Sequence, residues 1–161
     1  MKNGIFFLAL TVGALLTGCN NDRIFDKTYD LQNAQWSYQD TLSFAFDVRD
    51  TAEIYDIVLH LSHGVDYPMQ NLYMNIYTAF PGGQRVKQLL NIDLADQTGK
   101  WNGKISGKTC DYEIKIQENA FFNALGKHTI TLEPFMRVNP LPAIKSVGLT
   151  VIDTKHKKGE K

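Results

Sequence analysis

Hydrophobic side chains recur at every second position along most of this chain. In the segment 42–48 they are Leu42, Phe44, Phe46 and Val48, with small or polar residues between them. Period two places successive side chains on opposite faces of a β-strand, so such a segment predicts a strand with one buried face. The same pattern recurs over residues 55–61, 72–78, 112–116, 130–132 and 147–151, and less regularly over 88–94.

Tight turns separate these segments. Glycine, proline and asparagine tolerate the backbone angles of tight turns, and they cluster at Pro81-Gly82-Gly83, Asp96-Gln97-Thr98-Gly99, Asn102-Gly103, Leu125-Gly126 and Asn139-Pro140. Short strands that alternate with turns are typical of an all-β fold. We expect an antiparallel β-sandwich of about eight strands with a jelly-roll-like arrangement. Residues 118–125 could add one or two turns of helix.

The N-terminus has the pattern of a secretory signal. Lys2 precedes an uncharged, apolar run over residues 4–16. This run is shorter than the roughly 20 residues that a transmembrane helix needs, which favours a signal peptide. The sequence LTGC at residues 16–19 resembles the bacterial lipobox. We therefore predict a lipoprotein signal peptide over residues 1–18 and a lipid on Cys19. The alternative is an ordinary signal peptide with Cys19 packed or paired in the domain.

The rest of the chain is long enough for one domain with a hydrophobic core. Residues 19–33 are polar and charged, and we expect them to form a lipid-anchored tether. Residues 34–153 should form the β-sandwich domain. Residues 154–161 should form a charged, disordered tail. For this last segment, contact with a lipid surface is the alternative.

Charge and cysteine content exclude some partners and bonds. Loss of Lys2 with the signal peptide leaves 16 basic and 17 acidic residues. Such a chain has no basic field for phosphate backbones, so we expect no nucleic-acid partner. With Cys19 acylated, Cys110 has no second cysteine for a disulfide. We expect Cys110 to be a small residue at the entrance of a strand rather than a reactive thiol.

Sequence motifs for catalysis are absent. The chain has no GxSxG, HExxH or P-loop motif, and no GxGxxG between a strand and a helix. His60, His63 and Asp66 have a spacing like that of metal ligands, but residues three apart on a strand point to opposite faces. We therefore expect no enzymatic activity, no metal and no cofactor. Two carboxylates that converge in a cleft would instead indicate a glycosidase.

Aromatic residues suggest where a ligand could bind. Tyr73 and Tyr77 should share the outer face of one strand, opposite its buried residues. Such a strip can stack on a sugar or anchor a protein partner. The alternative is that a loop or a second layer covers it. Trp36 and Trp101 are further candidates for stacking on a sugar.

Several short motifs occur in an order that resembles one family. They are Trp36 followed by Asp40, Phe44 and Phe46; Tyr67-Pro68 with Asn71-Leu72; Trp101-Asn102-Gly103; and Met136-Arg137 followed by Leu141, Ile144 and Val147-Gly148-Leu149. With the lipobox cysteine, the combination resembles GldH, the gliding-motility-associated lipoprotein family of Bacteroidetes. The resemblance covers the signal peptide and nearly all of residues 20–153. The family pattern has a basic residue where this chain has His63 and a glycine where it has Ala143.

The resemblance implies a non-catalytic accessory or adaptor lipoprotein of the gliding motor and its associated secretion machinery. Other cell-envelope proteins would be its partners, and Cys19 is carried over as the lipidation site. The residues after Cys19 lack an acidic cluster of the kind that surface-exported lipoproteins carry. We therefore expect an outer-membrane anchor on the periplasmic face rather than the cell surface, with the inner membrane as a further alternative. The possible binding surface comprises Tyr67, Tyr73, Tyr77, Trp101 and Arg137. The alternative function is a carbohydrate-binding envelope lipoprotein in a non-gliding bacterium.

Overall fold

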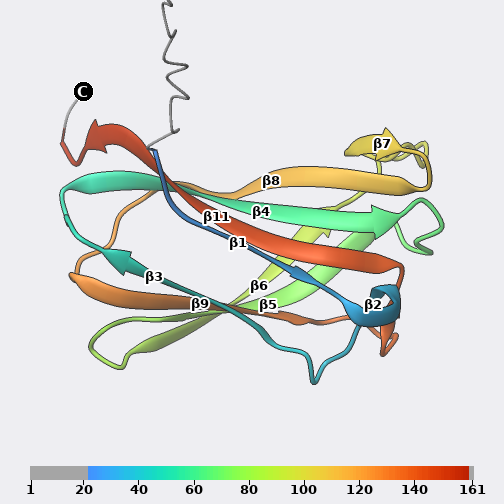
Figure 1. The fold of residues 1–161 in the computed structure, drawn as a ribbon, viewed down its shortest axis with the longest axis horizontal. Coiled ribbons are helices and arrows are strands. Elements are labelled where there is room, and N and C mark those ends of the chain that lie inside the picture. Colours follow the sequence, from blue (N-terminus) through green and yellow to red (C-terminus); the bar gives the residue numbers. More distant parts are fainter. Residues whose placement is uncertain (1–21, 160–161) are drawn as a thin grey trace, which may run out of the picture.

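The structure is a computed structural model that describes residues 22–159 (Figure 1). The predicted signal peptide over residues 1–18 and the predicted lipidation site Cys19 lie outside this range. The described chain consists of strands, turns and one 3₁₀ segment, η1 (Gln32–Ala34). Between residues 22 and 159 no helix has the length and apolar character needed to span a bilayer.

Eight long strands carry the described fold, in agreement with the expected number. They are β1 (Arg23–Asp30), β3 (Leu42–Val48), β4 (Glu53–Gly64), β5 (Asn71–Ala79), β6 (Arg85–Asp93), β8 (Thr109–Ala120), β9 (Gly126–Pro134) and β11 (Ile144–Lys157). The connections contain the short strands β2 (Gln35–Trp36), β7 (Lys104–Ser106) and β10 (Leu141–Pro142).

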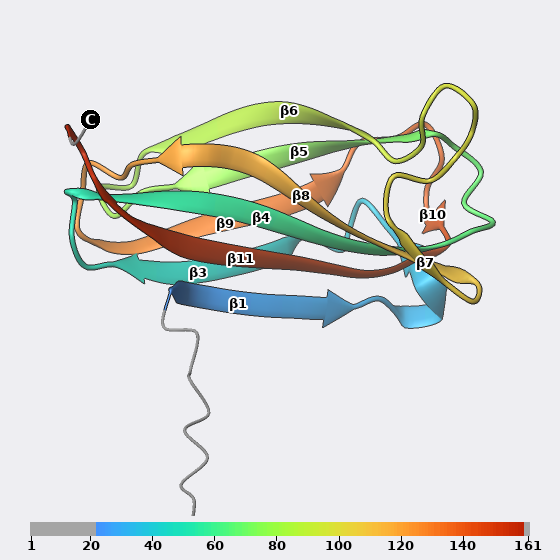
Figure 2. The ribbon, with the colours of Figure 1, turned by 90° about the horizontal axis from the view of Figure 1, so that it is seen from above.

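The long strands form two antiparallel sheets that lie face to face (Figures 1 and 2). One sheet has the order β1-β11-β4-β8-β7, and the other has the order β3-β9-β5-β6. Most neighbouring strands are therefore distant in sequence. Among the eight long strands this is the order of a jelly roll, in which two Greek keys fold together. The predicted antiparallel β-sandwich is confirmed.

The core lies where the alternating faces of the two sheets meet. In β3, buried and exposed residues alternate along the whole strand. Leu59 of β4 and Leu149 of β11 are fully buried on the opposing sheet. The period of two arises because one face of each strand packs in the core while the other meets water.

Strand β1 corrects the expected tether. The sequence predicts a tether over residues 19–33, but residues 23–30 form β1 and pair along its length with β11. The rings of Phe25 and Tyr29 pack on Phe44 of the other sheet. Most other residues of β1 are exposed because β1 is an edge strand, which explains its polar composition. The sandwich thus begins with β1.

Strand β11 corrects the expected disordered tail. The predicted tail spans residues 154–161, yet β11 continues to Lys157, which pairs with Glu53 of β4. The N–H of Lys158 then donates a 2.7 Å hydrogen bond to the carbonyl oxygen of Ala52. Residues 154–158 therefore belong to the sandwich.

The helical turns expected over residues 118–125 do not form. Strand β8 continues to Ala120, and a turn leads into β9 at Gly126. Phe122 in this turn is 6% exposed and packs against Phe46. Packing of one phenylalanine into the core thus outweighs the local preference for helix.

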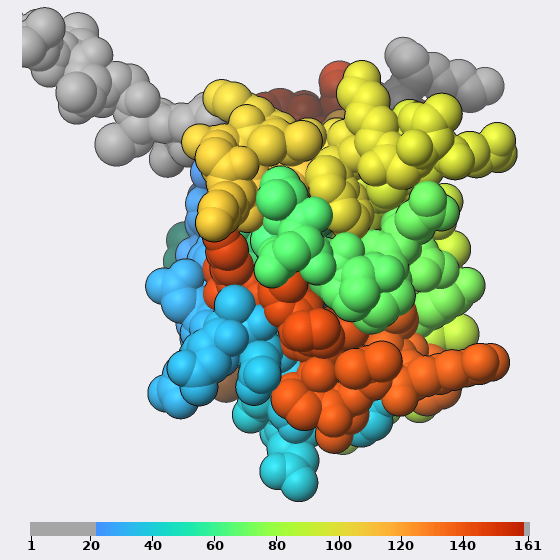
Figure 3. Space-filling view, turned by 90° about the vertical axis from the view of Figure 1, so that its right-hand side faces the viewer, coloured from blue at the N-terminus to red at the C-terminus, as the bar shows by residue number. Residues whose placement is uncertain are grey.

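The sandwich has two ends that differ in their loops (Figure 1). What we call the Asp22 end comprises Asp22, the end of β11 and the connections 49–52, 80–84 and 121–125. What we call the Trp101 end comprises the connections 31–41, 65–70, 94–103 and 135–143. Figure 3 shows these longer connections gathered over the Trp101 end. Binding residues often lie on loops, so the Trp101 end is the end where we expect a binding site.

Candidate functional site

A groove opens at the Trp101 end of the four-stranded sheet. Its volume is ≈ 500 Å³. It is lined by Met69, Tyr73, Leu89, Phe135, Met136, Arg137 and Val138. We call it the apolar groove, because six of these seven side chains carry no charge. Its walls come from β5, from β6, from the segment that follows β9 and, through Met69, from the connection before β5.

Hydrogen bonds hold the wall that follows β9. Phe135 donates its N–H to the carbonyl oxygen of Tyr73, at 2.8 Å. Tyr73 in turn directs its own N–H to Sδ of Met136, at 3.2 Å. The segment after Pro134 therefore stays beside the start of β5 instead of leaving the sheet.

Four large hydrophobic side chains of the groove are exposed. The exposed fraction is 57% for Leu89, 56% for Phe135, 48% for Val138 and 36% for Tyr73. Single exposed hydrophobic residues are normal on a protein surface, but a contiguous apolar patch marks a site of interaction. The fold gathers these four residues from three parts of the chain into one patch.

Arg137 adds a positive charge to the apolar groove. Its side chain is exposed. Within residues 22–159, Arg137 forms no ion pair with a carboxylate. A guanidinium can hold a carboxylate through two parallel hydrogen bonds. The groove is thus suited to a ligand with an apolar group and a nearby carboxylate.

The outer face of β5 carries Tyr77 beside the groove. Its phenol donates a 2.7 Å hydrogen bond to Oε2 of Glu133 on β9. The ammonium of Lys87 lies 5.2 Å from the centroid of its ring. Tyr73 and Tyr77 therefore share one face of the strand, as the alternation predicts.

Tyr67 and Trp101 lie apart from the groove, in a cluster around His63. Tyr67 is 4% exposed, its hydroxyl donates to the carbonyl oxygen of Asn71 at 3.1 Å, and burial raises its pKa. The half-buried ring of Trp101 lies 4.6 Å from that of His63 and 6.4 Å from that of Tyr67, between centroids. We call these three residues the His63 cluster. Of the predicted binding residues, only Tyr73 and Arg137 line the groove.

His63 is fully buried. Its Nδ1 lies 2.8 Å from the carbonyl oxygen of Gly64, while Nε2 has no hydrogen-bond partner in the described part of the chain. Burial lowers its pKa, although the contact with Gly64 opposes this shift. Cys110, opposite His63 on β8, is also buried, and burial raises the pKa of its thiol. Neither side chain is poised as a nucleophile or a base.

His60, His63 and Asp66 do not converge on a metal site. Nε2 of His60 lies 2.7 Å from Oγ1 of Thr150, whereas His63 points into the core. Over residues 22–159, no group of three or more His, Cys, Asp or Glu side chains has an arrangement that could hold a metal ion.

Stacking on a sugar is restricted to fewer rings than the sequence offers. Trp36 is fully buried, and its Nε1–H donates a 2.9 Å hydrogen bond to the carbonyl oxygen of Asp40. Trp101 is half-buried, and its ring packs against those of His63 and Tyr67. Tyr73 and Tyr77 remain as the rings that could meet a sugar on the outer face.

The sequence analysis did not identify Met69, Leu89, Phe135 or Val138. One signal was present: the alternation breaks at Leu89-Leu90. Successive residues on a strand cannot face the same side, so one of two adjacent leucines must be left outside the core. Leu89 is that residue. Phe135 and Val138 follow the last position of β9, where no periodic pattern applies.

Comparisons with known proteins identify relatives over most of the chain. A family model described as GldH lipoprotein matches residues 23–151. The chain is 24% identical over 135 residues to a "Gliding motility lipoprotein GldH homolog" of Christiangramia forsetii, covering 84% of this chain and 82% of the relative. It is 25% identical over 157 residues to "Gliding motility lipoprotein GldH" of Flavobacterium johnsoniae, covering 93% and 95%.

A solved structure of similar outline is a carbohydrate-binding module described as specific for non-crystalline cellulose. It shares 13% identity with this chain and covers 83% of it, while the chain covers 73% of the module, with a TM-score of 0.39.

Proposed function

The chain belongs to the GldH lipoprotein family, and from this premise we propose that it is a non-catalytic accessory lipoprotein of the gliding-motility type. In this role it binds other proteins of the cell envelope and acts as an adaptor for the gliding motor and its associated secretion machinery. The observation that carries the proposal is the apolar groove, with Leu89 and Phe135 more than half exposed.

The anchor in this proposal is a lipid on Cys19. The lipobox at residues 16–19 supports it, as do relatives that are described as lipoproteins. We infer the outer membrane as the site of the anchor. We infer its periplasmic face as the side, because no acidic cluster of the kind found in surface-exported lipoproteins follows Cys19. Two proteins confined to one membrane meet at a raised effective concentration, so a modest contact at the groove suffices for association.

The partner that fits the groove is an extended, acidic segment of a protein. Strand β6 is the last strand of its sheet, so its outer backbone groups can pair with an added strand. Arg85 and Lys87 lie on this strand and Arg137 lies in the groove. These three cations favour carboxylates on the added segment, while the apolar groove accepts one of its hydrophobic side chains.

A role without catalysis is supported by the state of the reactive groups. The buried Cys110 has a raised pKa, and the buried His63 has a lowered one. Neither faces the groove. We therefore propose binding rather than turnover at this site.

Binding of a glycan is the second candidate function. It is favoured by Tyr73 and Tyr77 on one outer face, with the carboxylate of Glu133 bonded to the Tyr77 phenol. Residues four apart on a strand are about 13 Å apart, which suits two separate sugar rings. Aromatic faces stack on sugars, and a neighbouring carboxylate can accept sugar hydroxyls.

In vivo photocrosslinking in the native host tests the proposal. A photoreactive amino acid at Val138 in the groove should capture a small set of envelope proteins, identified by mass spectrometry after purification of tagged protein. Ile105 is the matched control, because it is 53% exposed on β7 of the other sheet, and it should not capture them. Cys19→Ser should lose the capture while the domain still folds.

Three results would contradict the adaptor role. They are equal capture from both positions, undiminished capture by the unacylated Cys19→Ser variant, and capture of no protein. Retention of a glycan in place of protein would favour the second candidate.

A further inference from the structure

The chain between the predicted lipid anchor and the sandwich is short. Cys19 precedes Asp22 by three residues. An extended chain spans about 3.3–3.6 Å per residue, so the Cα atoms of Cys19 and Asp22 lie within roughly 11 Å of each other. A lipid on Cys19 would therefore hold the Asp22 end close to the membrane surface.

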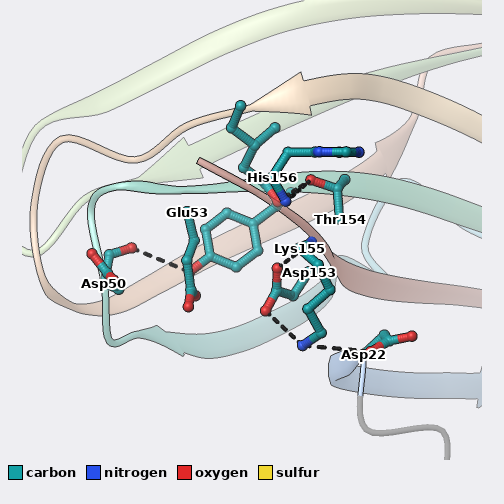
Figure 4. A network of polar contacts seen from close by, with 9 residues as sticks. Asp22, Asp50, Glu53, Asp153, Thr154, Lys155 and His156 are labelled. Carbon is teal, nitrogen blue, oxygen red and sulfur yellow. Dashed lines mark hydrogen bonds and ion pairs between the residues drawn. The ribbon is translucent and has the colours of Figure 1, made fainter. Parts of the chain in front are cut away.

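Asp22 is itself fixed to the sandwich. Its carbonyl oxygen accepts a 2.7 Å hydrogen bond from the N–H of Asp153. Figure 4 shows Lys155 between two carboxylates, 2.8 Å from that of Asp153 and 3.4 Å from that of Asp22. The part of the sandwich that the structure describes thus begins immediately before β1, and only three residues of sequence separate Asp22 from Cys19.

The strand register aligns Asp22 with one residue on each of the next strands of the five-stranded sheet. Asp22 bonds to Asp153, Asp153 pairs with Tyr55, and Tyr55 pairs with Ala120. Adjacent strands lie about 4.8 Å apart, so this row is roughly 14–15 Å long. The turn that follows Ala120 consequently lies at the same end of the molecule as Asp22.

This turn exposes two large hydrophobic side chains. Phe121 is 51% exposed and Leu125 is 59% exposed. Between them Phe122 is buried, with its ring 5.5 Å from that of Phe46 and 4.6 Å from that of His128. The buried phenylalanine fixes the turn to the core, and its two hydrophobic neighbours are left at the surface.

One lysine contacts the exposed pair, and the same end of the sandwich also carries carboxylates of Asp22, Asp50, Glu53 and Asp153 (Figure 4). The ammonium of Lys158 is 4.4 Å from the ring centroid of Phe121. Arg49 and Lys127 are exposed near the paired ends of β3 and β9. Aromatic rings with adjacent lysines are typical of membrane interfaces, where the ring lies at headgroup level and the ammonium reaches the lipid phosphates.

We propose that the Asp22 end rests on the lipid surface, with Phe121 and Leu125 inserted among the headgroups and Lys158 facing the lipid phosphates. The inference rests on the proposed lipid at Cys19 and adds an orientation to it. The strands then run away from the membrane. Strand β4 has 12 residues, a length of about 40 Å, so the apolar groove at the Trp101 end is presented well beyond the headgroups.

Fluorescence quenching by lipid tests the orientation. Full-length acylated protein, purified from membranes, is reconstituted in vesicles of phosphatidylethanolamine and phosphatidylglycerol that contain a doxyl-labelled phospholipid. A fluorophore is attached to Asn123→Cys at the Asp22 end or to Lys108→Cys at the Trp101 end, both exposed positions. Burial and a raised pKa protect Cys110 from the label. The probe at position 123 should lose most of its fluorescence, and the probe at position 108 should keep it.

A double substitution tests the two hydrophobic residues. Phe121→Ser combined with Leu125→Ser should lower the ratio of docked to undocked molecules by roughly tenfold or more, because it removes most of the apolar surface that enters the lipid. Ile105→Ser is the matched control, since Ile105 is a 53% exposed aliphatic residue on β7 that lies outside the groove. It should leave quenching at position 123 unchanged. Thermal unfolding of both variants checks that the fold is retained.

Flotation of the vesicles separates the two inferences. Wild-type protein that fails to float would overturn the lipid anchor and the orientation together. Flotation with equal quenching at both positions would overturn the orientation alone. The same holds if the double variant is quenched like the wild type, or if the Asp22 end crosslinks to a second copy of the chain instead of meeting lipid.

Discussion

The imidazole of His63 and the indole of Trp101 lie edge to face, with ring centroids 4.6 Å apart and an angle of 67° between the planes. Nε2 of His63 is buried and has no hydrogen-bond acceptor within residues 22–159. A proton at this nitrogen would thus be buried without compensation. The folded chain therefore favours the neutral imidazole, and burial lowers the pKa of His63.

Acidification should destabilise the protein through His63. Its pKa is about 6.5 in the unfolded chain and lower in the folded chain, so the unfolded chain binds more protons below that pH. The stabilisation is complete above about pH 6.5 and is lost as the pH falls toward the folded pKa. Urea unfolding at a series of pH values measures this slope.

Two histidine variants identify the source of the slope. His63→Phe should make the free energy of unfolding depend less on pH than in the wild type. His156→Gln, which changes an exposed histidine, should leave the slope as it is. A His63→Phe protein with the slope of the wild type would assign the effect to other groups.

Substitution of Gly103 should destabilise the Trp101 end. A Cβ at this position would lie 2.6 Å from the carbonyl oxygen of Asp111 and 2.7 Å from Sγ of Cys110. Gly103→Ala should lower the free energy of unfolding by about 1–3 kcal/mol, as overpacking usually does. Gly82→Ala is the control, because a Cβ there meets no heavy atom within 4 Å. Equal melting temperatures for the two variants would contradict the packing account.

Glycine at position 143 should stabilise the protein. Ala143 has a φ of 59°, a left-handed conformation that is costly for alanine and easy for glycine. Ala143→Gly should raise the free energy of unfolding by about 0.5–1 kcal/mol, which chemical denaturation can resolve. Ala124 does not have a positive φ, so Ala124→Gly should bring no gain.

Charge reversal in the groove should weaken partner binding without unfolding the protein. Arg137→Glu places a negative charge where an acidic segment is proposed to bind, and Leu89→Asp adds a charge to an apolar wall. Each should reduce the yield of crosslinked partner by roughly tenfold, in the range of interface hot spots. Ile105→Asp should retain the yield. Unchanged crosslinking in both groove variants would place the interface elsewhere.

The sequence predicted the strands that bury one face and missed the strand that does not. Leu42, Phe44 and Phe46 alternate strictly because β3 packs in the core. Strand β1 lies at the edge of its sheet, and only Phe25 and Tyr29 of its side chains pack on the core. An edge strand with so few buried side chains has the composition of a tether, so a pattern of burial could not reveal it.

The site was predictable only in part, for a similar reason. Tyr73 and Arg137 stand in recognisable motifs, and the fold brings them into one groove. Leu89 and Phe135 join them from positions 46 residues apart in the chain, through the pairing of β5 with β6 and β9. The break in alternation at Leu89-Leu90 marks one exposed leucine, but the sequence does not show which other exposed hydrophobic residues lie beside it until the strands pair.

The antiparallel pairing of β1 with β11 also determines how the domain would bear mechanical load. In the proposed orientation, a pull between the lipid and a partner in the groove acts along the strands, and it enters the fold at the start of β1. From Arg23 to Asp30 this strand is paired with β11, so the bonds of the ladder would be stressed together in shear rather than opened one after another. Strand β1, which has the composition of a tether in the sequence, would thus be the strand that takes up this force first, and its pairing with β11 would resist it.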